Sequence, residues 1–219
     1  MNTHPTQRTY TSLEAAYDHF NRELFGSQLP ACLITMQRHK GAYGYFSGAR
    51  FASTEDPQEV TDEIALNPAH FASRPTAGTL STLAHEMAHL WQHHQGTPSR
   101  TGYHNKEWAA KMREIGLIPV SHDHPGKETG QKVSHTIEQG GRFEQACSAY
   151  LATGTAFLYH DRAGDGDAAT RKKKAASKTK YTCPACEMNA WAKPNARLIC
   201  GDCSEEMEAE EPEGRIIVP

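Results

Sequence analysis

The sequence lacks a long hydrophobic run and an apolar leader. No apolar stretch approaches the roughly 20 residues that a membrane-spanning helix needs. The first residues, MNTHPTQRTY, are polar and lack the apolar segment of a signal peptide. We therefore expect a soluble protein of the cytoplasm that has no membrane partner.

The sequence is also modest in hydrophobic and aromatic residues, which make up 37% and 8% of its 219 residues. A chain of this length and composition can form the core of one domain of ordinary size and still have a small appendage. It contains no internal repeat, so we do not expect a repeat architecture. One main globular domain is the simplest expectation.

The net charge of -3 conceals two segments of opposite sign. Residues 171–180, RKKKAASKTK, contain six basic side chains and no acidic one, whereas residues 204–213, SEEMEAEEPE, contain six glutamates and no basic one. Such segments are typical of linkers and disordered tails. We expect four parts, which are a main domain over residues 1–160, a flexible basic linker over 161–180, a cysteine unit over 181–204 and an acidic disordered tail over 205–219.

The hydrophobic pattern of the main domain predicts an α+β fold. Four segments place apolar residues at helical spacing, and three shorter segments are rich in β-forming residues between Gly, Pro and polar breaks. We expect helices over residues 11–25, 79–94, 105–115 and 142–152. We expect the strands of a small antiparallel sheet within residues 31–39, 43–51 and 62–68. Residues 119–141 are rich in His, Gly and polar residues and predict a long excursion.

Residues at the predicted helix ends support these boundaries. Thr11 and Glu14 have the spacing of a capping box, and Gly26 is suited to end that helix. Asn105 is a candidate cap for the third helix, and Gly116 follows its last turn.

The segment TLSTLAHEMAHLWQ contains His85, Glu86 and His89 in the pattern H-E-x-x-H. Residues four apart on a helix project from the same face, so both imidazoles can reach one zinc ion. Glu86 points partly sideways and can contact a water on that ion. Zinc lowers the pKa of such a water toward about 7, and Glu86 can take its proton and later pass it to a leaving amine. The pattern therefore predicts zinc-dependent peptide hydrolysis.

The alternative is that the pattern arises by chance, because it fixes only three positions. The apolar surroundings argue against chance. Two histidines and a glutamate on so apolar a helix are costly to bury without partners, and a metal with its water supplies them.

A catalytic zinc needs a third protein ligand and one open position. We discount His93 and His94, because a helix diverges from a single ion after two ligands. His104, in GYHNKEW at the start of the next helix, is the first candidate. Glu107 is its rival, since another class of metalloprotease takes a glutamate from a later helix.

The second candidate metal site lies near the end of the chain. Two C-x-x-C pairs separated by thirteen residues can close a tetrahedral structural zinc site with no open position. Metal binding would supply the folding free energy of so small a unit, on the order of 10–16 kcal/mol. The alternatives are free thiols or a redox-active pair. Cys32 and Cys147 are expected to be buried apolar residues. The four predicted ligands are Cys183, Cys186, Cys200 and Cys203.

The segments LFGSQLP, STLAHEMAHLWQ and GYHNKEWAAKMREIGL, in this order, resemble the SprT-like family, which includes the Spartan-type zinc metalloproteases. The resemblance covers about residues 10–118 and continues into the cysteine unit. It implies a zincin-like metallopeptidase domain, with His85, His89 and His104 as zinc ligands and Glu86 as the catalytic residue. Asn105 departs from the family, which often has Gly at that position.

The resemblance also implies that the zinc ribbon and the basic linker engage DNA. Clustered cations can contact phosphates without sequence preference, and an exposed Trp191 can stack on a base. The alternative is a solvated linker and a core tryptophan. The glutamates after Cys203 would compete with nucleic acid for the basic run. The predicted DNA-binding residues are Arg171, Lys172, Lys173, Lys174, Lys178, Lys180 and Trp191.

Other residues near the predicted centre have weaker signals. Core packing is the first expectation for Tyr43, Tyr45 and Phe46, although they also lie where a substrate strand could add to the sheet. Tyr103 is a candidate oxyanion donor beside His104. Most of the remaining histidines should be ordinary surface residues, and those considered for transition-state stabilisation are His122, His124 and His135.

We therefore expect a zinc endopeptidase with one catalytic and one structural zinc. Its substrates would be proteins bound or crosslinked to DNA, and the DNA partner would be single-stranded or crosslinked to protein. Such a substrate class implies a role in DNA–protein crosslink repair and association with the nucleoid. One rival is a general cytosolic zinc peptidase that does not need nucleic acid. Another is a DNA-binding or regulatory zinc protein whose zincin domain is not hydrolytic.

Overall fold

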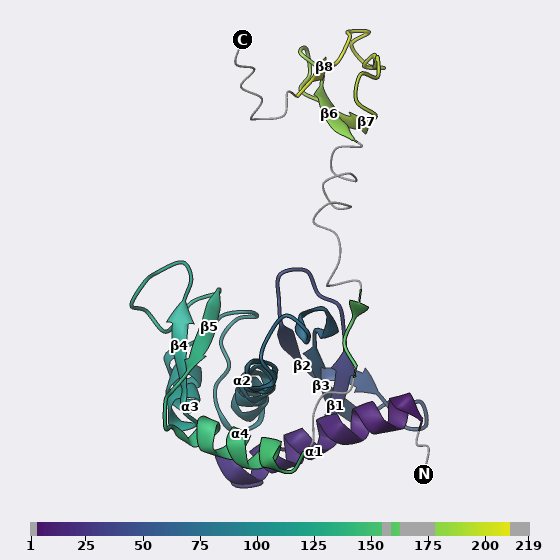
Figure 1. The fold of residues 1–219 in the computed structure, drawn as a ribbon. Coiled ribbons are helices and arrows are strands. Elements are labelled where there is room, and N and C mark those ends of the chain that lie inside the picture. Colours follow the sequence, from purple (N-terminus) through teal and green to yellow (C-terminus); the bar gives the residue numbers. More distant parts are fainter. Residues whose placement is uncertain (1–3, 155–158, 163–177, 211–219) are drawn as a thin grey trace. The chain divides into compact units, whose positions relative to one another are not determined.

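The computed structural model describes residues 4–154, 159–162 and 178–210, and the chain divides into two units, Met1–Asp165 and Gly166–Pro219 (Figure 1). The first unit contains four α-helices and two small sheets, and the second contains one small sheet within its described residues. The architecture is α+β, as the pattern predicts. Among the described helices, none combines the length and the hydropathy needed to cross a bilayer.

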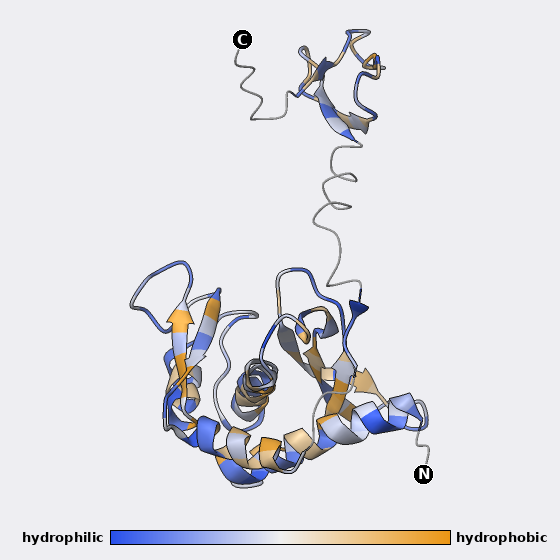
Figure 2. Cartoon of the chain, viewed as in Figure 1, coloured by the Kyte–Doolittle hydropathy of each residue, from blue (hydrophilic) through white to orange (hydrophobic). Residues whose placement is uncertain are grey.

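The first helix, α1 (Pro5–Phe25), is longer than the sequence pattern predicts. Pro5 opens it, because a proline at the first helical position has a suitable φ and needs no hydrogen bond to its nitrogen. The predicted capping box at Thr11 is therefore wrong. The helix ends at Gly26, whose φ of 63° is left-handed. Hydrophobic and hydrophilic residues alternate around α1, and its buried face joins the core (Figure 2).

Three strands form a mixed sheet in the order β1-β3-β2, with bounds Leu33–Met36 for β1, Gly44–Ala52 for β2 and Val60–Leu66 for β3. β2 and β3 are antiparallel, as expected, but β1 and β3 are parallel, so the prediction of a fully antiparallel sheet is wrong. β3 is the central strand, and its residues from Asp62 onward are buried. Periodicity identifies strands but does not set their direction.

The second helix, α2 (Thr76–Gln95), packs against β2, β3 and α3 (Lys106–Glu114). Figure 1 looks along α2, which lies between the sheet and a hairpin formed by β4 (Leu117–Ser121) and β5 (Val133–Ile137). Asn105 caps α3 as predicted, because its side-chain oxygen accepts the backbone N–H of Trp108 at 3.0 Å. A short 3-10 helix, Pro68–His70, precedes α2. The fourth helix, α4 (Arg142–Ala152), packs against α1.

The predicted excursion over residues 119–141 contains a regular hairpin, so that prediction is wrong. β4 (Leu117–Ser121) pairs antiparallel with β5 (Val133–Ile137). Pro119 weakens the strand signal, because proline cannot donate to a ladder and is confined to edge strands. A two-stranded sheet has only edge strands, so the proline is tolerated.

The second unit is built on three short strands in the order β7-β6-β8. Their bounds are Thr179–Thr182 for β6, Asn189–Ala192 for β7 and Glu208–Ala209 for β8. β8 pairs with β6, and Met207 is buried beside Tyr181. The expectation of a disordered tail from residue 205 is therefore wrong for residues 205–210. Residues 211–219, and 163–177 of the predicted linker, lie outside the described part.

Candidate metal centre

Three histidines meet beside the buried end of a cleft in the first unit. His85 and His89 lie on α2, and His104 lies just before α3. One ligand atom from each of the three lies within 4.8 Å of the other two. The structure thus brings together the three residues that the sequence pattern and the resemblance predict as ligands.

His104 is held in place by a strand-like bridge to Gly130. The two residues exchange backbone hydrogen bonds of 2.8 and 3.1 Å. The Nδ1 atom of His104 also donates to the Gly130 carbonyl oxygen, at 3.1 Å. This contact leaves Nε2 free to face His85 and His89. Asn105 therefore does not disturb the site, since it caps α3 while its neighbour points inward.

Glu107, the rival third ligand, is engaged elsewhere. Its Oε2 accepts hydrogen bonds from the backbone N–H of Thr97 and the side chain of Gln92, both at 2.7 Å. Among the described residues, it belongs to none of the groups whose atoms could surround one ion. Glu107 instead holds the loop between α2 and α3.

His85 and His104 are buried and His89 is half-buried, and removal from solvent favours the neutral form of all three imidazoles. It lowers the pKa of His85 well below its ordinary value, with His135 and His89 adding to the effect. It lowers the pKa of His89 to about 3, and it also lowers the pKa of His104. Trp108 packs against all three rings, with centroids 4.3–5.0 Å apart. Neutral imidazole is the form that binds a metal, so this donor set is compatible with zinc.

A hydrogen-bond chain fixes the tautomer of His85. Its Nδ1 lies 3.0 Å from Nδ1 of His135, whose Nε2 lies 2.9 Å from the Ser81 hydroxyl. Ser81 donates its proton to the Gly78 carbonyl oxygen at 3.0 Å, so it must accept from His135. His135 therefore accepts from His85 through Nδ1. The proton of His85 is on Nδ1, and its Nε2 carries the lone pair that a metal requires.

Glu86 follows His85 on α2 and lines the cleft without joining the histidine group. Burial raises the pKa of Glu86 to about 8, while a hydrogen bond from the backbone N–H of Phe46 opposes this shift. A divalent cation beside the carboxyl group would lower that pKa. The strand β2 approaches α2 closely here, since a Cβ on Gly44 would lie 2.9 Å from Cγ2 of Thr82 and 3.4 Å from Cγ of Glu86.

The cleft has a volume of about 740 Å³ and lies between β2 and the segments around residues 98–104 and 131–135. Tyr43 lines it and is 48% exposed, so the expectation of core packing is wrong for this residue. Tyr45 and Phe46 line it from β2, and Phe46 also packs against the core. Tyr103 and His122 contribute to the lining. His124 is exposed and lies outside the lining, whereas Cys147 is buried and Cys32 is half-buried.

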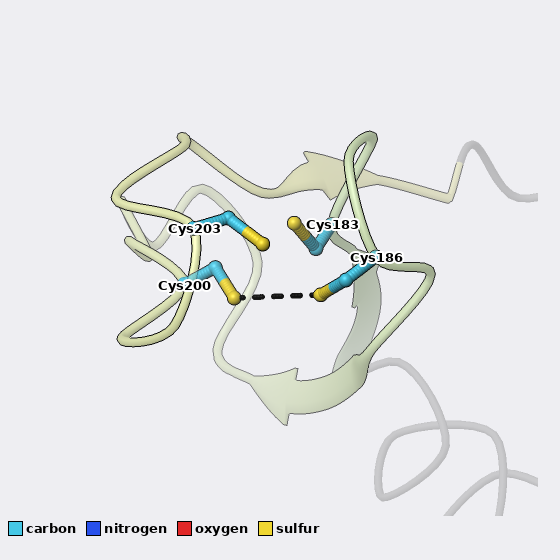
Figure 3. Close-up of side chains that lie close together, drawn as sticks. All are labelled: Cys183, Cys186, Cys200 and Cys203. Atoms are coloured by element: carbon cyan, nitrogen blue, oxygen red, sulfur yellow. Dashed lines mark hydrogen bonds between the residues drawn. The ribbon is translucent and has the colours of Figure 1, made fainter.

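Four cysteine side chains point toward one another in the second unit (Figure 3). Their sulfurs lie within 4.8 Å of one another, and the Sγ atoms of Cys186 and Cys200 are 3.7 Å apart. Sulfurs bound tetrahedrally at about 2.3 Å from zinc lie about 3.8 Å apart. The backbone N–H of Cys186 lowers the pKa of the Cys183 thiol to about 7, whereas neighbouring thiols raise the pKa values of Cys186 and Cys203. All the predicted ribbon ligands, Cys183, Cys186, Cys200 and Cys203, are therefore arranged compatibly with zinc.

The predicted DNA-binding residues are only partly described. Arg171, Lys172, Lys173 and Lys174 lie outside the described residues. Lys178 is exposed, and the amino group of Lys180 lies 3.5 Å from a carboxylate oxygen of Glu210. Trp191 is 63% exposed, which excludes the alternative of a core tryptophan.

Sequence reasoning did not find the role of His135 or Ser81. His135 was considered only for transition-state stabilisation, because its hairpin was not predicted. Ser81 lies four residues before His85 on the same helix face, and this spacing was the available signal.

Comparison with known proteins places the three histidines within a segment that matches a known family. The model of the SprT-like family matches residues 13–133, which is more than half of the chain. A relative described as an uncharacterized protein in the mucB 3′ region of Salmonella typhimurium is 53% identical over 60 residues, which are 27% of this chain and 80% of the relative. The family match includes the three histidines and Glu86 but ends two residues before His135.

Proposed function

The chain belongs to the SprT-like family, and on that premise we propose that it is a zinc-dependent endopeptidase. His85, His89 and His104 would hold the ion, and Glu86 would be the catalytic residue. The observation that carries the proposal is the convergence of three neutral imidazoles beside a buried carboxyl group at one cleft. When bound, zinc would polarise the scissile carbonyl and increase the acidity of a water molecule.

Glu86 would act as the general base and then as the acid. Its carboxylate would take a proton from the attacking water and release it to the departing amine, so that the group ends the cycle unchanged. The Phe46 N–H would stabilise and orient the carboxylate form. The burial that raises its pKa makes Glu86 a stronger base than an exposed glutamate.

The strand β2 would position the substrate. It is an edge strand of the sheet, and its residues from Gly44 to Gly48 line the cleft. An extended peptide could add to this edge through backbone hydrogen bonds, which are independent of side-chain identity. This arrangement favours a protease of low sequence selectivity that acts on extended or unfolded segments.

The zinc ribbon would bring the peptidase to proteins on DNA. The exposed Trp191 would stack on an unpaired base, and the cations at Lys178, Lys180 and residues 171–174 would contact phosphates. Linking the two units would raise the effective concentration of peptidase at DNA-bound substrates. Proteins bound or crosslinked to DNA are therefore the proposed substrate class.

The test of peptidase activity compares the wild type with Glu86→Gln on a denatured protein substrate. Glutamine preserves the shape of the side chain but cannot take up a proton, so cleavage should fall by about 10²–10⁴-fold. Equal zinc content in the two proteins is the control. Complete absence of cleavage by the zinc-loaded wild type, with and without DNA, would support the non-hydrolytic rival.

The test of DNA targeting repeats the comparison with single-stranded DNA present. Cleavage of a DNA-bound substrate should rise with DNA for the wild type and not for Trp191→Ala, while both cleave a free peptide equally. Glu210→Gln should tighten DNA binding at low salt, because it releases Lys180 from its ion pair. Full activity without DNA, unchanged by Trp191→Ala, would favour the general peptidase.

A further inference from the structure

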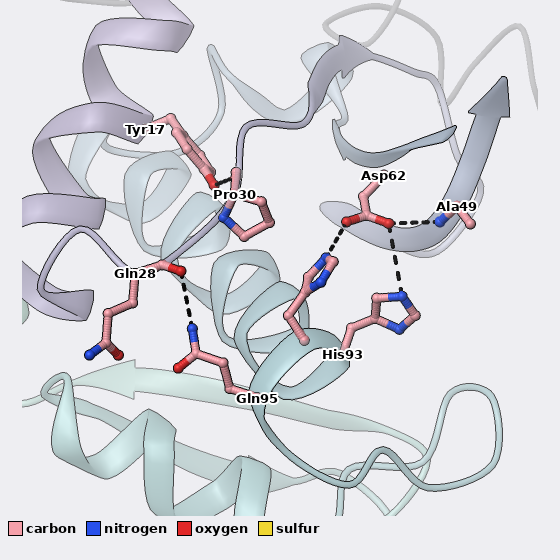
Figure 4. Close-up of polar contacts among 8 residues, drawn as sticks. Tyr17, Gln28, Pro30, Ala49, Asp62, His93 and Gln95 are labelled. Carbon is pink, nitrogen blue, oxygen red and sulfur yellow. Dashed lines mark hydrogen bonds and ion pairs between the residues drawn. The ribbon is translucent and has the colours of Figure 1, made fainter. Parts of the chain in front are cut away.

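A second cluster of potential ligands lies at the C-terminal end of α2. The Nε2 atom of His94 is 2.6 Å from Oδ2 of Asp62 on β3, and Nε2 of His93 is 3.9 Å from Oδ1 (Figure 4). One donor atom from each residue lies within 4.8 Å of the other two. The cluster therefore combines two imidazoles with one carboxylate.

This cluster shares no residue with the His85, His89 and His104 group. His93 follows His89 by four residues on α2 but belongs to the separate set around Asp62. His93 also lines the cleft, together with Ser47 and Gly48 of β2. The second set thus reaches the same cleft through His93, which lies one turn beyond His89 on α2.

The backbone of β2 is shaped around His93 and Asp62. A Cβ on Gly48 would lie 2.7 Å from Cε1 of His93, so a side chain at this position would displace the ring. Ala49 has a left-handed φ of 48°, which is unfavourable for a residue with a side chain. This conformation directs its N–H to Oδ1 of Asp62 at 2.7 Å. The register of β2 against β3 shifts at this point, between Ser47 and Phe51.

A simple ion pair would not need this arrangement. The contact between His94 and Asp62 is complete without His93, which lies beyond hydrogen-bond distance of the carboxylate. Strained backbone that persists in a fold is a reason to look for function nearby. The carboxylate is 8% exposed whereas both imidazoles are about 40% exposed, so the three donors form a half-open site.

We propose that Asp62, His93 and His94 bind a divalent transition-metal ion of the zinc type, in addition to the two zinc sites described above. Imidazole nitrogens select zinc and its neighbours over magnesium and calcium, which prefer oxygen ligands. Three protein ligands leave a position open to solvent or to a substrate group in the cleft. Binding requires the donors of His94 and Asp62 to move apart from 2.6 Å to about 3.3 Å, the separation of two ligands at 2.0–2.1 Å from zinc.

The test uses the full-length chain and counts bound zinc by native mass spectrometry across a zinc titration. His93→Ala is the informative variant, because it removes one donor and leaves the Asp62–His94 contact intact. The wild type should bind one more zinc than His93→Ala. His122→Ala is the matched control, since it removes another histidine of the cleft lining and should bind as many ions as the wild type.

The difference between the two proteins is the readout, so the result does not depend on peptidase activity or on occupancy of the other sites. Thermal unfolding in excess chelator should be nearly the same for the wild type and His93→Ala. Zinc should raise the unfolding temperature of the wild type more than it raises that of His93→Ala. Equal zinc counts for these two proteins would overturn the proposal and leave an ion pair only.

Discussion

The Nδ1 atoms of His85 and His135 lie 3.0 Å apart, which joins the H-E-x-x-H helix to the β4–β5 hairpin. His135 accepts a hydrogen bond from His85 through Nδ1 and donates one to the Ser81 hydroxyl through Nε2. The hairpin is therefore a support for the candidate metal centre. His135 lies outside the segment that the family match covers, although β4 lies within it.

This contact predicts that His135 positions His85 for metal binding. His135→Ala should weaken zinc binding about 10–100-fold, because loss of the partner of a ligand frees its ring and tautomer. His135→Asn should restore much of the affinity, since its amide oxygen can occupy the place of Nδ1. The measurement is zinc dissociation against a chelator, with His122→Ala as the control. Equal affinities for the Ala and Asn variants would contradict the positioning role.

The third ligand is tested by a pair of substitutions. His104→Ala should remove the tightly bound zinc of the first unit, whereas Glu107→Ala should retain it. Glu107→Ala should instead lower the free energy of unfolding by about 1–3 kcal/mol, because Thr97 N–H and Gln92 lose their acceptor. Metal analysis and urea unfolding of both variants check this assignment. Zinc lost from Glu107→Ala and kept in His104→Ala would reverse it.

The metal-free protein should be less stable in acid. The pKa of His89 is lowered to about 3 and that of His135 to about 4, whereas an unfolded histidine titrates near 6.5. Below pH 6.5 the unfolded state binds more protons than the folded state. The stability that the neutral histidines contribute is therefore fully present above pH 6.5 and is lost as the pH falls toward 4. The pKa of Glu86, raised to about 8, makes the folded state more stable as the pH falls, but this is one group against several histidines.

The measurement is urea unfolding in chelator at pH 7 and pH 5, in a Trp191→Phe background so that fluorescence reports the first unit. The free energy of unfolding should fall between these values, and His135→Asn should reduce that fall by on the order of 1–2 kcal/mol. A stability independent of pH in this range would show that the imidazoles are not held neutral by burial.

The acidic end of the ribbon should be structural as far as residue 210. Truncation after residue 204 removes β8, the buried Met207 and the 2.8 Å hydrogen bond from Cys200 N–H to the Glu205 carbonyl oxygen. It should weaken cobalt binding to the four thiolates at least about tenfold. Truncation after residue 210 should leave the affinity unchanged. The thiolate-to-cobalt absorption band measures the cobalt affinity of both truncated proteins. Equal affinities of the two would contradict a role for β8.

The helices and the pairs of metal ligands close in sequence could be predicted because their signals are local. The spacing of His85 and His89, the cap at Asn105 and the two C-x-x-C pairs all depend on residues close in sequence. β1 was identified as a strand, but its parallel direction depends on the path of the chain around β3. Local periodicity contains no information about that path.

Contacts between distant segments could not be read from the pattern. His135 lies 50 residues after His85, and Pro119 obscured the strand that holds its hairpin. The cluster at Asp62 depends on a register shift in β2, which alternation does not reveal. β8 could not be predicted because Met207 and Ala209 are isolated apolar residues within a run of glutamates.

X-ray absorption tests the central claim most directly. The sample is the full-length chain with the ribbon cysteines and His93 replaced, loaded with one equivalent of zinc. The account predicts three imidazoles and one oxygen at about 2.0–2.1 Å, with no sulfur, and one fewer imidazole in His104→Ala. A zinc shell with two or fewer imidazoles, or one unchanged by His104→Ala, would contradict the convergence of His85, His89 and His104 on one ion.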